Sequence, residues 1–249
     1  RKALAGRRSV FALAVVSKTV MPARVSASQV FSHKLVVITD DRASVLALYS
    51  SSMHVLWAYR NCSTMRQDLN YSPTDAFETF PRPPMSEGLE RIGRMLDTER
   101  REIMLRRQLG LTKLYNLVND PELPAGVDAD VDRMRQIHVE LDREVMAAYG
   151  WGDIDLDHGF HTYRQMTRWT VCPAARVELL DRLLEENHRR AALQDGAPPP
   201  AEDDAADATD DEVLGGDSAR ECQTAVRRWS RDDHDRGARI DAARGDGGG

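Results

Sequence analysis

The composition of the chain changes abruptly after Gln194, and this change limits how much of its 249 residues can fold. Residues 195–218 contain nine acidic side chains and no Lys or Arg, and they include the run Pro198-Pro199-Pro200. Such a segment cannot bury enough apolar surface to offset the loss of chain entropy. We therefore expect residues 193–249 to form an acidic, disordered tail and the preceding residues to form the globular part.

Short strands are predicted near the N-terminus. Residues 10–16 form a continuous apolar run, residues 21–25 form a shorter one, and residues 35–39 are rich in β-branched side chains. Runs of this length and composition are typical of buried strands. No stretch approaches the ~20 apolar residues that a membrane span requires, so no membrane partner is expected.

A secretory signal peptide is the alternative for this region, because basic residues precede the first apolar run and Val25-Ser26-Ala27 resembles a cleavage site. Lys18 and Arg24 lie between the run and that site, which favours the buried strand. The basic residues before the run are Arg1, Lys2, Arg7 and Arg8.

Residues 43–59 carry apolar side chains at a helical spacing, and we predict one helix there although three consecutive serines, residues 50–52, weaken its middle. Residues 61–84 end in a proline-rich run. Because repeated prolines neither continue a helix nor fit a central strand, this segment is predicted to run extended over a surface.

Helical periodicity dominates from Ser86, which can cap a helix whose charged side chains include Arg91, Glu99 and Arg100. Its predicted apolar face consists of Leu89, Ile92, Leu96 and Ile103. Three more helices are expected, at residues 111–118, at residues 131–149 before Gly150, and from Pro173 onward. The last should bury Val177, Leu180 and Leu184, and residues 168–171 could form a short strand.

The predicted fold class is therefore α+β. We expect a small β-containing part at residues 1–84, a mainly α-helical region at residues 85–192, and the tail at residues 193–249. Cys62, Cys172 and Cys222 are too widely spaced to indicate a disulfide framework or a zinc site, so a reducing cytoplasm fits best.

Charge is distributed unevenly along the chain. Residues 1–120 contain 18 Lys and Arg against 11 Asp and Glu, a net charge of +7, whereas residues 121–249 contain 16 against 29, a net charge of −13. Clustered Lys and Arg displace counterions from phosphates, so the first half could face a polyanion. The alternative is that these side chains only solvate the surface.

Catalytic motifs are missing from the sequence. A methyltransferase acting on adenine needs a Gly-rich cofactor loop and an Asp/Asn-Pro-Pro-Tyr/Phe motif, and the nearest string, Asn119-Asp120-Pro121-Glu122, is predicted to be a helix-terminating turn. None of the four lysines follows a Glu at the Glu-x-Lys spacing of a nuclease. We predict no catalytic and no cofactor-binding residues in this chain.

Residues 153–164 resemble the opening of a calcium loop, with Asp153, Asp155 and Asp157 in alternate positions. His158 stands where such a loop needs Gly, and Arg164 stands where it needs Glu. His158 and His161 have no third convincing ligand. The segment is predicted to be a polar surface loop without a metal.

Three strings, at residues 51–57, 69–75 and 77–83, occur in an order that resembles the end of the target-recognition domain in large adenine-specific DNA methyltransferases. Such enzymes belong to type II-like restriction-modification and phage-defence systems. Residues 112–116, 141–151 and 176–188 resemble their helical C-terminus, so the similarity covers roughly residues 10–192.

This resemblance implies that double-stranded DNA is the ligand and that a catalytic domain, which uses S-adenosylmethionine, lies N-terminal to the recognition domain. A nuclease can be linked elsewhere. Because the chain begins at Arg1 rather than Met and lacks the catalytic motifs, we expect it to be a fragment that is inactive alone. The missing catalytic domain is then its expected partner.

Large aromatic residues within the three strings are expected to anchor the recognition domain rather than to touch DNA; they are Trp57, Tyr71, Phe77 and Phe80. Basic residues of the first part are the predicted DNA contacts, because guanidinium and ammonium groups suit phosphates and guanine edges. They are Arg7, Arg8, Lys18, Arg24, Lys34, Arg60 and Arg66. The alternative function is a helical interaction module that docks on the missing domain and has little DNA affinity.

Overall fold

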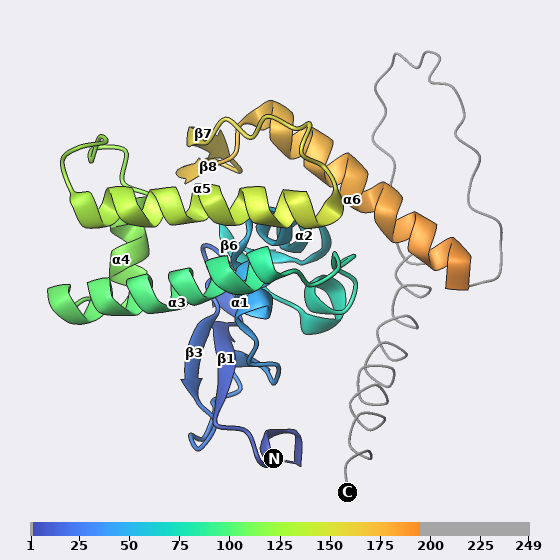
Figure 1. Cartoon of the computed structure of the whole chain (residues 1–249), viewed down its shortest axis with the longest axis horizontal. Helices are drawn as coiled ribbons and strands as arrows, with labels where there is room; N and C mark the ends of the chain where they lie inside the picture. Colours follow the sequence, from blue (N-terminus) through green and yellow to red (C-terminus); the bar gives the residue numbers. More distant parts are fainter. Residues whose placement is uncertain (1, 195–249) are drawn as a thin grey trace, which may run out of the picture.

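The computed structural model describes residues 2–194, and the predicted tail beyond Gln194 lies outside the described residues. Within this range, small antiparallel sheets are followed by a mostly helical region, so the predicted α+β class is confirmed. The sheet that contains β1 lies at one end, the β7–β8 hairpin lies at the other, and helices lie between them (Figure 1). Among the described residues, no helix is both long and apolar enough to cross a membrane.

The first sheet has the order β3-β1-β4 and follows a short 3-10 turn, η1 (Lys2–Leu4). Its strands are β1 (Ser9–Ala14), β3 (Ala23–Ser26) and β4 (Leu35–Ile38), with Phe11 opposite both Arg24 and Ile38. Residues 10–13 are all buried because β1 is the central strand. The predicted buried strand is confirmed.

A second sheet joins β2 (Val16–Ser17), β6 (Asp68–Asn70) and β5 (Thr64–Met65). The prediction that residues 61–84 run extended over a surface was therefore only partly right. They contain the β5–β6 hairpin and a π-helical turn, η2 (Pro73–Phe77). The hairpin pairs with β2, a contact between distant segments that local composition does not encode.

The single helix predicted at residues 43–59 is broken at Ser51. It forms α1 (Ala43–Ser50) and α2 (Ser52–Asn61). Ser51 has extended backbone angles, φ −74° and ψ 156°, and its hydroxyl accepts a hydrogen bond from the backbone N–H of His54 at 3.3 Å. Serine competes for helix backbone groups through its side chain, so it caps a new helix instead of continuing the old one.

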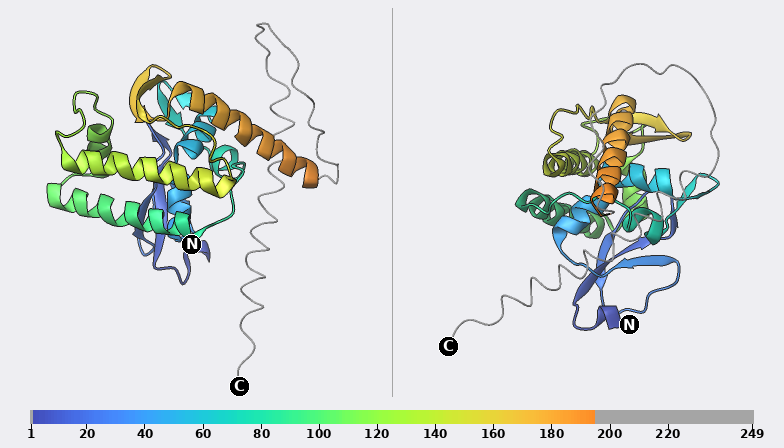
Figure 2. Two further views of the ribbon diagram at one scale, coloured as in Figure 1. Left: turned by 45° about the horizontal axis from the view of Figure 1, so that its top comes forward. Right: turned by 90° about the vertical axis from the view of Figure 1, so that its right-hand side faces the viewer.

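The long helices α3 (Glu87–Arg107) and α5 (Ala129–Tyr149) lie side by side and antiparallel (Figures 1 and 2). Ser86 caps α3 by accepting from the N–H of Leu89 at 3.1 Å, as predicted. Gly150 ends α5 with a left-handed φ of 80°, also as predicted. The apolar face predicted for α3 is buried.

Arg100 departs from the prediction, because it is buried within α3 rather than lying on its charged face. Its guanidinium donates to the carbonyl oxygen of Pro22 at 2.9 Å and to the hydroxyl of Tyr115 at 3.4 Å. Buried charges need such hydrogen-bond partners. Helical periodicity predicted an exposed Arg100 because it cannot take account of Pro22, whose carbonyl oxygen is distant in the sequence.

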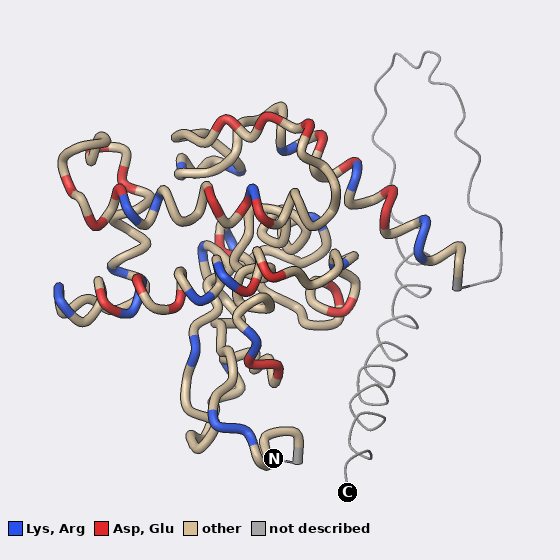
Figure 3. Tube along the Cα trace, in the orientation of Figure 1, with Lys and Arg blue, Asp and Glu red and all other residues tan. Residues whose placement is uncertain are grey.

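Ion pairs connect α3 to α5 along their length, and both helices carry Arg interspersed with Asp and Glu (Figure 3). Arg133 pairs with Glu99 at 2.5 Å, and Arg107 pairs with Asp128 at 2.8 Å. Because these charges neutralise one another, much of the helical surface is not available to a polyanion.

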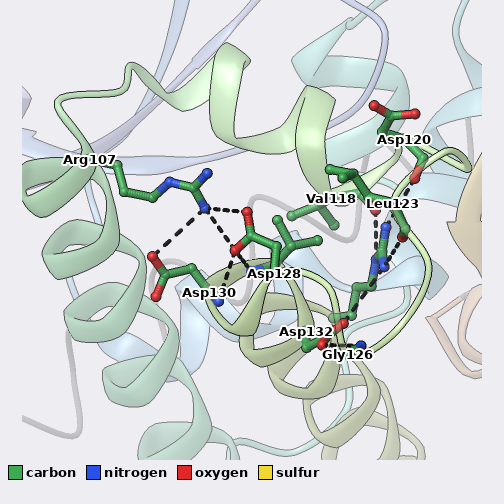
Figure 4. Close-up of polar contacts among 10 residues, drawn as sticks. Arg107, Val118, Asp120, Leu123, Gly126, Asp128, Asp130 and Asp132 are labelled. Atoms are coloured by element: carbon green, nitrogen blue, oxygen red, sulfur yellow. Dashed lines mark hydrogen bonds and ion pairs between the residues drawn. The ribbon is translucent and has the colours of Figure 1, made fainter.

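The short helix α4 (Leu111–Val118) and the loop that follows it lie between α3 and α5 in the chain. Arg135 is buried and donates to three carbonyl oxygens there, those of Val118 at 3.0 Å, Leu123 at 2.8 Å and Asp120 at 3.1 Å. Figure 4 shows this loop beside the Arg107 contacts to Asp128 and Asp130. The backbone of this loop is therefore held in place at both ends.

The hairpin of β7 (Gly159–Tyr163) and β8 (Met166–Thr170) precedes α6 (Pro173–Gln194). The strand predicted near residues 168–171 is confirmed, but its partner β7 was not predicted. Val177 is 62% exposed, so its predicted burial was wrong. Leu179 and Leu183 take the buried positions, and α6 runs across the molecule beyond the hairpin (Figure 2).

Candidate nucleic-acid interface

Two hairpin turns meet on one side of the described part of the chain. The β5–β6 turn contains Arg66 and Gln67, and the β7–β8 turn contains Arg164 and Gln165. The side-chain amide of Gln67 donates to that of Gln165 at 3.3 Å. Arg66, Arg164 and Gln165 all have positive φ values, 59°, 46° and 64°, which tight turns impose on them.

Tyr59 of α2 contacts both the β7–β8 hairpin and the segment that follows β2. Its hydroxyl donates to the carbonyl oxygen of Lys18 at 2.7 Å, and its ring lies 5.9 Å from the ring of Tyr163 in an edge-on arrangement. Its carbonyl oxygen accepts from Nη2 of Arg164 at 3.0 Å. Burial raises the pKa of Tyr59, so its hydroxyl remains a donor at neutral pH.

Basic residues of α2, of the segment after β2 and of the two hairpins form what we name the hairpin patch. Its members are Lys18, Arg60, Arg66, Arg164 and Arg168. The first four are exposed, whereas Arg168 is half-buried. Within residues 2–194, none of the five lies within 4.0 Å of a carboxylate in an ion pair. Burial lowers the pKa of Arg168, although Asp68 and Tyr59 oppose this effect.

The structure thus brings together three of the seven predicted DNA contacts, Lys18, Arg60 and Arg66. Arg7 and Arg8 are exposed immediately before β1, and Lys34 is exposed beside the opposite end of that strand. These three residues flank the strands of the first sheet and are not part of the hairpin patch.

Arg24, the seventh predicted contact, is engaged within the protein. It donates to Asp97 at 2.5 Å, to the carbonyl oxygen of Asp41 at 2.9 Å and to the hydroxyl of Ser9 at 3.1 Å. Its guanidinium also lies 4.7 Å from the centroid of the Phe11 ring. Contact between DNA and any of the seven residues stays a prediction.

The predicted DNA contacts do not include Arg164 and Arg168, because these two residues lie in the half of the chain with a negative net charge. A local signal was present, since aromatic and basic residues are adjacent in Tyr163-Arg164 and in Arg168-Trp169. Such pairs suit both phosphate contacts and base stacking.

The four aromatic residues predicted to be anchors pack against other residues of the protein. Trp57 donates to the hydroxyl of Thr79 at 2.9 Å, the Tyr71 hydroxyl lies 2.9 Å from Nε2 of His54, and Phe80 is fully buried. Phe77 is half-buried and stacks on Tyr49 at 4.6 Å. These residues hold η2 and the following prolines against α1 and α2.

The segment that resembles a calcium loop has other partners. Arg182 pairs with Asp153 at 2.5 Å, and Nε2 of His158 lies 2.8 Å from the carboxylate of Asp142. Within residues 2–194, no group of three His, Cys, Asp or Glu side chains is arranged to hold a metal.

Comparison with known proteins gives one family match, to the model described as "MmeI, target recognition domain", over residues 15–84. No curated protein matches the chain. A solved structure of the type IIL restriction-modification enzyme MmeI in complex with DNA is similar, with a TM-score of 0.47 and 15% sequence identity. The similarity covers 74% of this chain and 21% of that one, so the chain spans about a fifth of its length. Residues 15–84 thus match the MmeI target recognition domain, and the family resemblance expected from the sequence is confirmed over this range.

Proposed function

We propose that this chain is the DNA-recognition part of a restriction-modification enzyme that methylates adenine, and that it binds double-stranded DNA through the hairpin patch. The observation that carries the proposal is the family match at residues 15–84, because Lys18, Arg60 and Arg66 lie inside the matched range.

The composition of the patch supports phosphate contact. Its exposed guanidinium and ammonium groups have no carboxylate partners among the described residues, so a polyanion can reach them without breaking an ion pair. Arg and Lys at phosphates position a protein on the duplex, whereas side chains that reach base edges read its sequence. Arg164 and Arg168 extend the surface beyond the matched range, and the DNA surface thus spans two parts of the chain.

Methyl transfer belongs, in this proposal, to a domain N-terminal to the recognition domain, where S-adenosylmethionine would bind. The chain alone should then bind DNA without modifying it. A role in phage defence and a cytoplasmic location follow from the same proposal. The competing function is the interaction module, which would dock on the catalytic domain and bind DNA weakly.

DNA affinity measured over a range of salt concentrations tests the proposal. Each phosphate contact adds about 0.9 to the slope of log affinity against log salt. Arg66→Gln should lower both affinity and slope, whereas Arg143→Gln removes the same charge from an exposed position on α5 and should change neither. Absence of DNA binding by the unmodified chain would favour the interaction module.

A further inference from the structure

A small cleft of about 90 Å³ opens beside the hairpin patch. Segments far apart in the sequence form its walls, including β8, α6, the end of α1 and the residues after β2. Its polar walls include Lys18, Ser50, Arg168, Trp169 and Arg176. One Lys and two Arg line this cleft and no Asp or Glu does, so the net charge of its lining is positive.

Four of these side chains carry buried polar atoms without a hydrogen-bond partner among the described residues. They are Oγ of Ser50, Nε of Arg168, Nε1 of Trp169 and Nη1 of Arg176. The three nitrogens can only donate. Orphaned donors are rare in folded proteins, because each costs about 1–3 kcal/mol when buried. All four side chains line the same cleft, which favours a ligand that accepts hydrogen bonds.

Arg176 is the most informative of the four, since it is only 6% exposed. Its Nη2 donates to the carbonyl oxygen of Thr162 at 3.2 Å, and its guanidinium lies 4.8 Å from the centroid of the Tyr163 ring. No carboxylate of residues 2–194 pairs with it. A buried charge that lacks a counterion destabilises a protein, and an anion in the cleft would remove this penalty.

The neighbouring loop keeps the cleft in shape. Asn119 accepts a hydrogen bond from the backbone N–H of Trp169 at 3.2 Å. The guanidinium of Arg135, which also binds the loop carbonyls, lies 5.3 Å from the centroid of the Trp169 ring. The indole therefore belongs to a rigid wall, and its N–H is held in place before any ligand arrives.

We propose that this cleft is a binding site for a phosphate group. The basic and polar side chains come from four segments, α1, β8, α6 and the residues after β2, and a tetrahedral, multiply charged phosphate can accept hydrogen bonds from several of them at once. Arg168, Arg176 and Lys18 supply the positive charge, and Ser50 and Trp169 supply neutral donors. The phosphate is either a free phosphate compound or a backbone phosphate of DNA, and only the second source rests on the proposed function.

Binding of inorganic phosphate to the full chain is the primary test, measured by titration calorimetry at constant ionic strength with acetate as comparator. We expect specific phosphate binding that Arg176→Gln weakens about tenfold, equivalent to about 1.4 kcal/mol. Lys18→Gln, at an exposed position, tests the same site if the buried variant does not fold. Lys113→Gln removes an exposed lysine outside the cleft and serves as the matched control.

A second measurement separates the two sources. Duplexes in which single phosphates are replaced by neutral methylphosphonates should bind the unmodified chain more weakly at one position, and Lys18→Gln should abolish that difference, if a DNA phosphate enters the cleft. Phosphate binding without competition against DNA would identify a free phosphate compound. Absence of phosphate binding, or equal weakening by Lys113→Gln, would overturn the site, and DNA binding that persists in that case would leave the proposed function intact.

Discussion

Nη2 of Arg164 donates to the backbone carbonyl oxygen of Tyr59 at 3.0 Å, across 105 residues of sequence. The carbonyl belongs to the last turn of α2, where the helix dipole favours a cation. This contact thus fixes the β7–β8 hairpin on a helix inside the matched range and holds a basic side chain at the proposed DNA surface.

Substitution of Arg164 should weaken DNA binding. Arg164→Gln removes a charge and its anchor on Tyr59, so we expect a loss of roughly tenfold in affinity at 0.1 M salt, where the Debye length is about 10 Å. Arg164→Lys keeps the charge but loses the planar guanidinium that lies against the Tyr59 and Tyr163 rings, and it should show an intermediate loss. Fluorescence anisotropy with a labelled duplex measures both. Equal affinities for Arg164→Gln and the exposed-site control Arg143→Gln would exclude Arg164 from the interface.

Gly93→Ala should destabilise the protein severely. A Cβ at this position in α3 would lie 1.9 Å from the carbonyl oxygen of Ala43, and a backbone atom cannot move aside as a flexible side chain can. We expect a loss of about 3 kcal/mol or more in the free energy of unfolding. Gly152→Ala is the control, since nothing lies within 4 Å of its added Cβ, and it should change stability by less than about 0.5 kcal/mol. Urea denaturation compares them, and similar midpoints would contradict the close packing of α1 on α3.

Stability should fall as the pH drops below about 6.5. Burial lowers the pKa of His54 to about 3 and that of His138 to about 4, both below the ordinary value of 6.5. Between these values the unfolded chain takes up protons that the folded chain does not, so the stabilising effect is complete above pH 6.5 and is lost toward pH 4. Each histidine contributes a slope of at most about 1.4 kcal/mol per pH unit.

Urea denaturation at pH 7, 6 and 5 measures this slope. His138→Gln should reduce it, because one titrating group is gone, while His188→Gln, at an exposed position on α6, should leave it unchanged. A constant free energy of unfolding over this pH range would show that the two buried histidines accept protons in the folded state.

Deletion of residues 195–249 should tighten DNA binding at low salt. Residues 195–218 carry nine acidic side chains, and a polyanion near a basic surface competes with DNA within about a Debye length. The effect should fade at high salt, where screening is stronger. Titrations of the full and truncated chains at two salt concentrations provide the comparison, and identical affinities at low salt would remove these residues from the mechanism.

Much of the helical region could be predicted from the sequence because its signals are local. The apolar face of α3, its cap at Ser86 and the terminating Gly150 of α5 all depend on residues within a few positions of one another. Tertiary contacts decided the exceptions. Arg100 is buried because Pro22 offers a carbonyl oxygen, and Val177 is exposed because Leu179 and Leu183 face the core instead.

The candidate interface could be predicted only in part for the same reason. Charge alone indicates Lys18, Arg60 and Arg66, whereas averaging charge over the second half of the chain hides Arg164 and Arg168. Their contribution depends on the meeting of two hairpins, marked by the contact between Gln67 and Gln165. Pairing between distant turns leaves no periodic trace in the sequence.

All eight residues of α1 are buried, and α1 lies inside the matched range while its main packing partner, α3, lies outside it. An exchange of residues 15–84 with those of a relative would cut through this shared core. A working chimera would have to carry the facing side of α3, including Gly93, as well as the β7–β8 hairpin. The segment that could be exchanged without breaking the core is therefore larger than residues 15–84, the range that sequence similarity outlines.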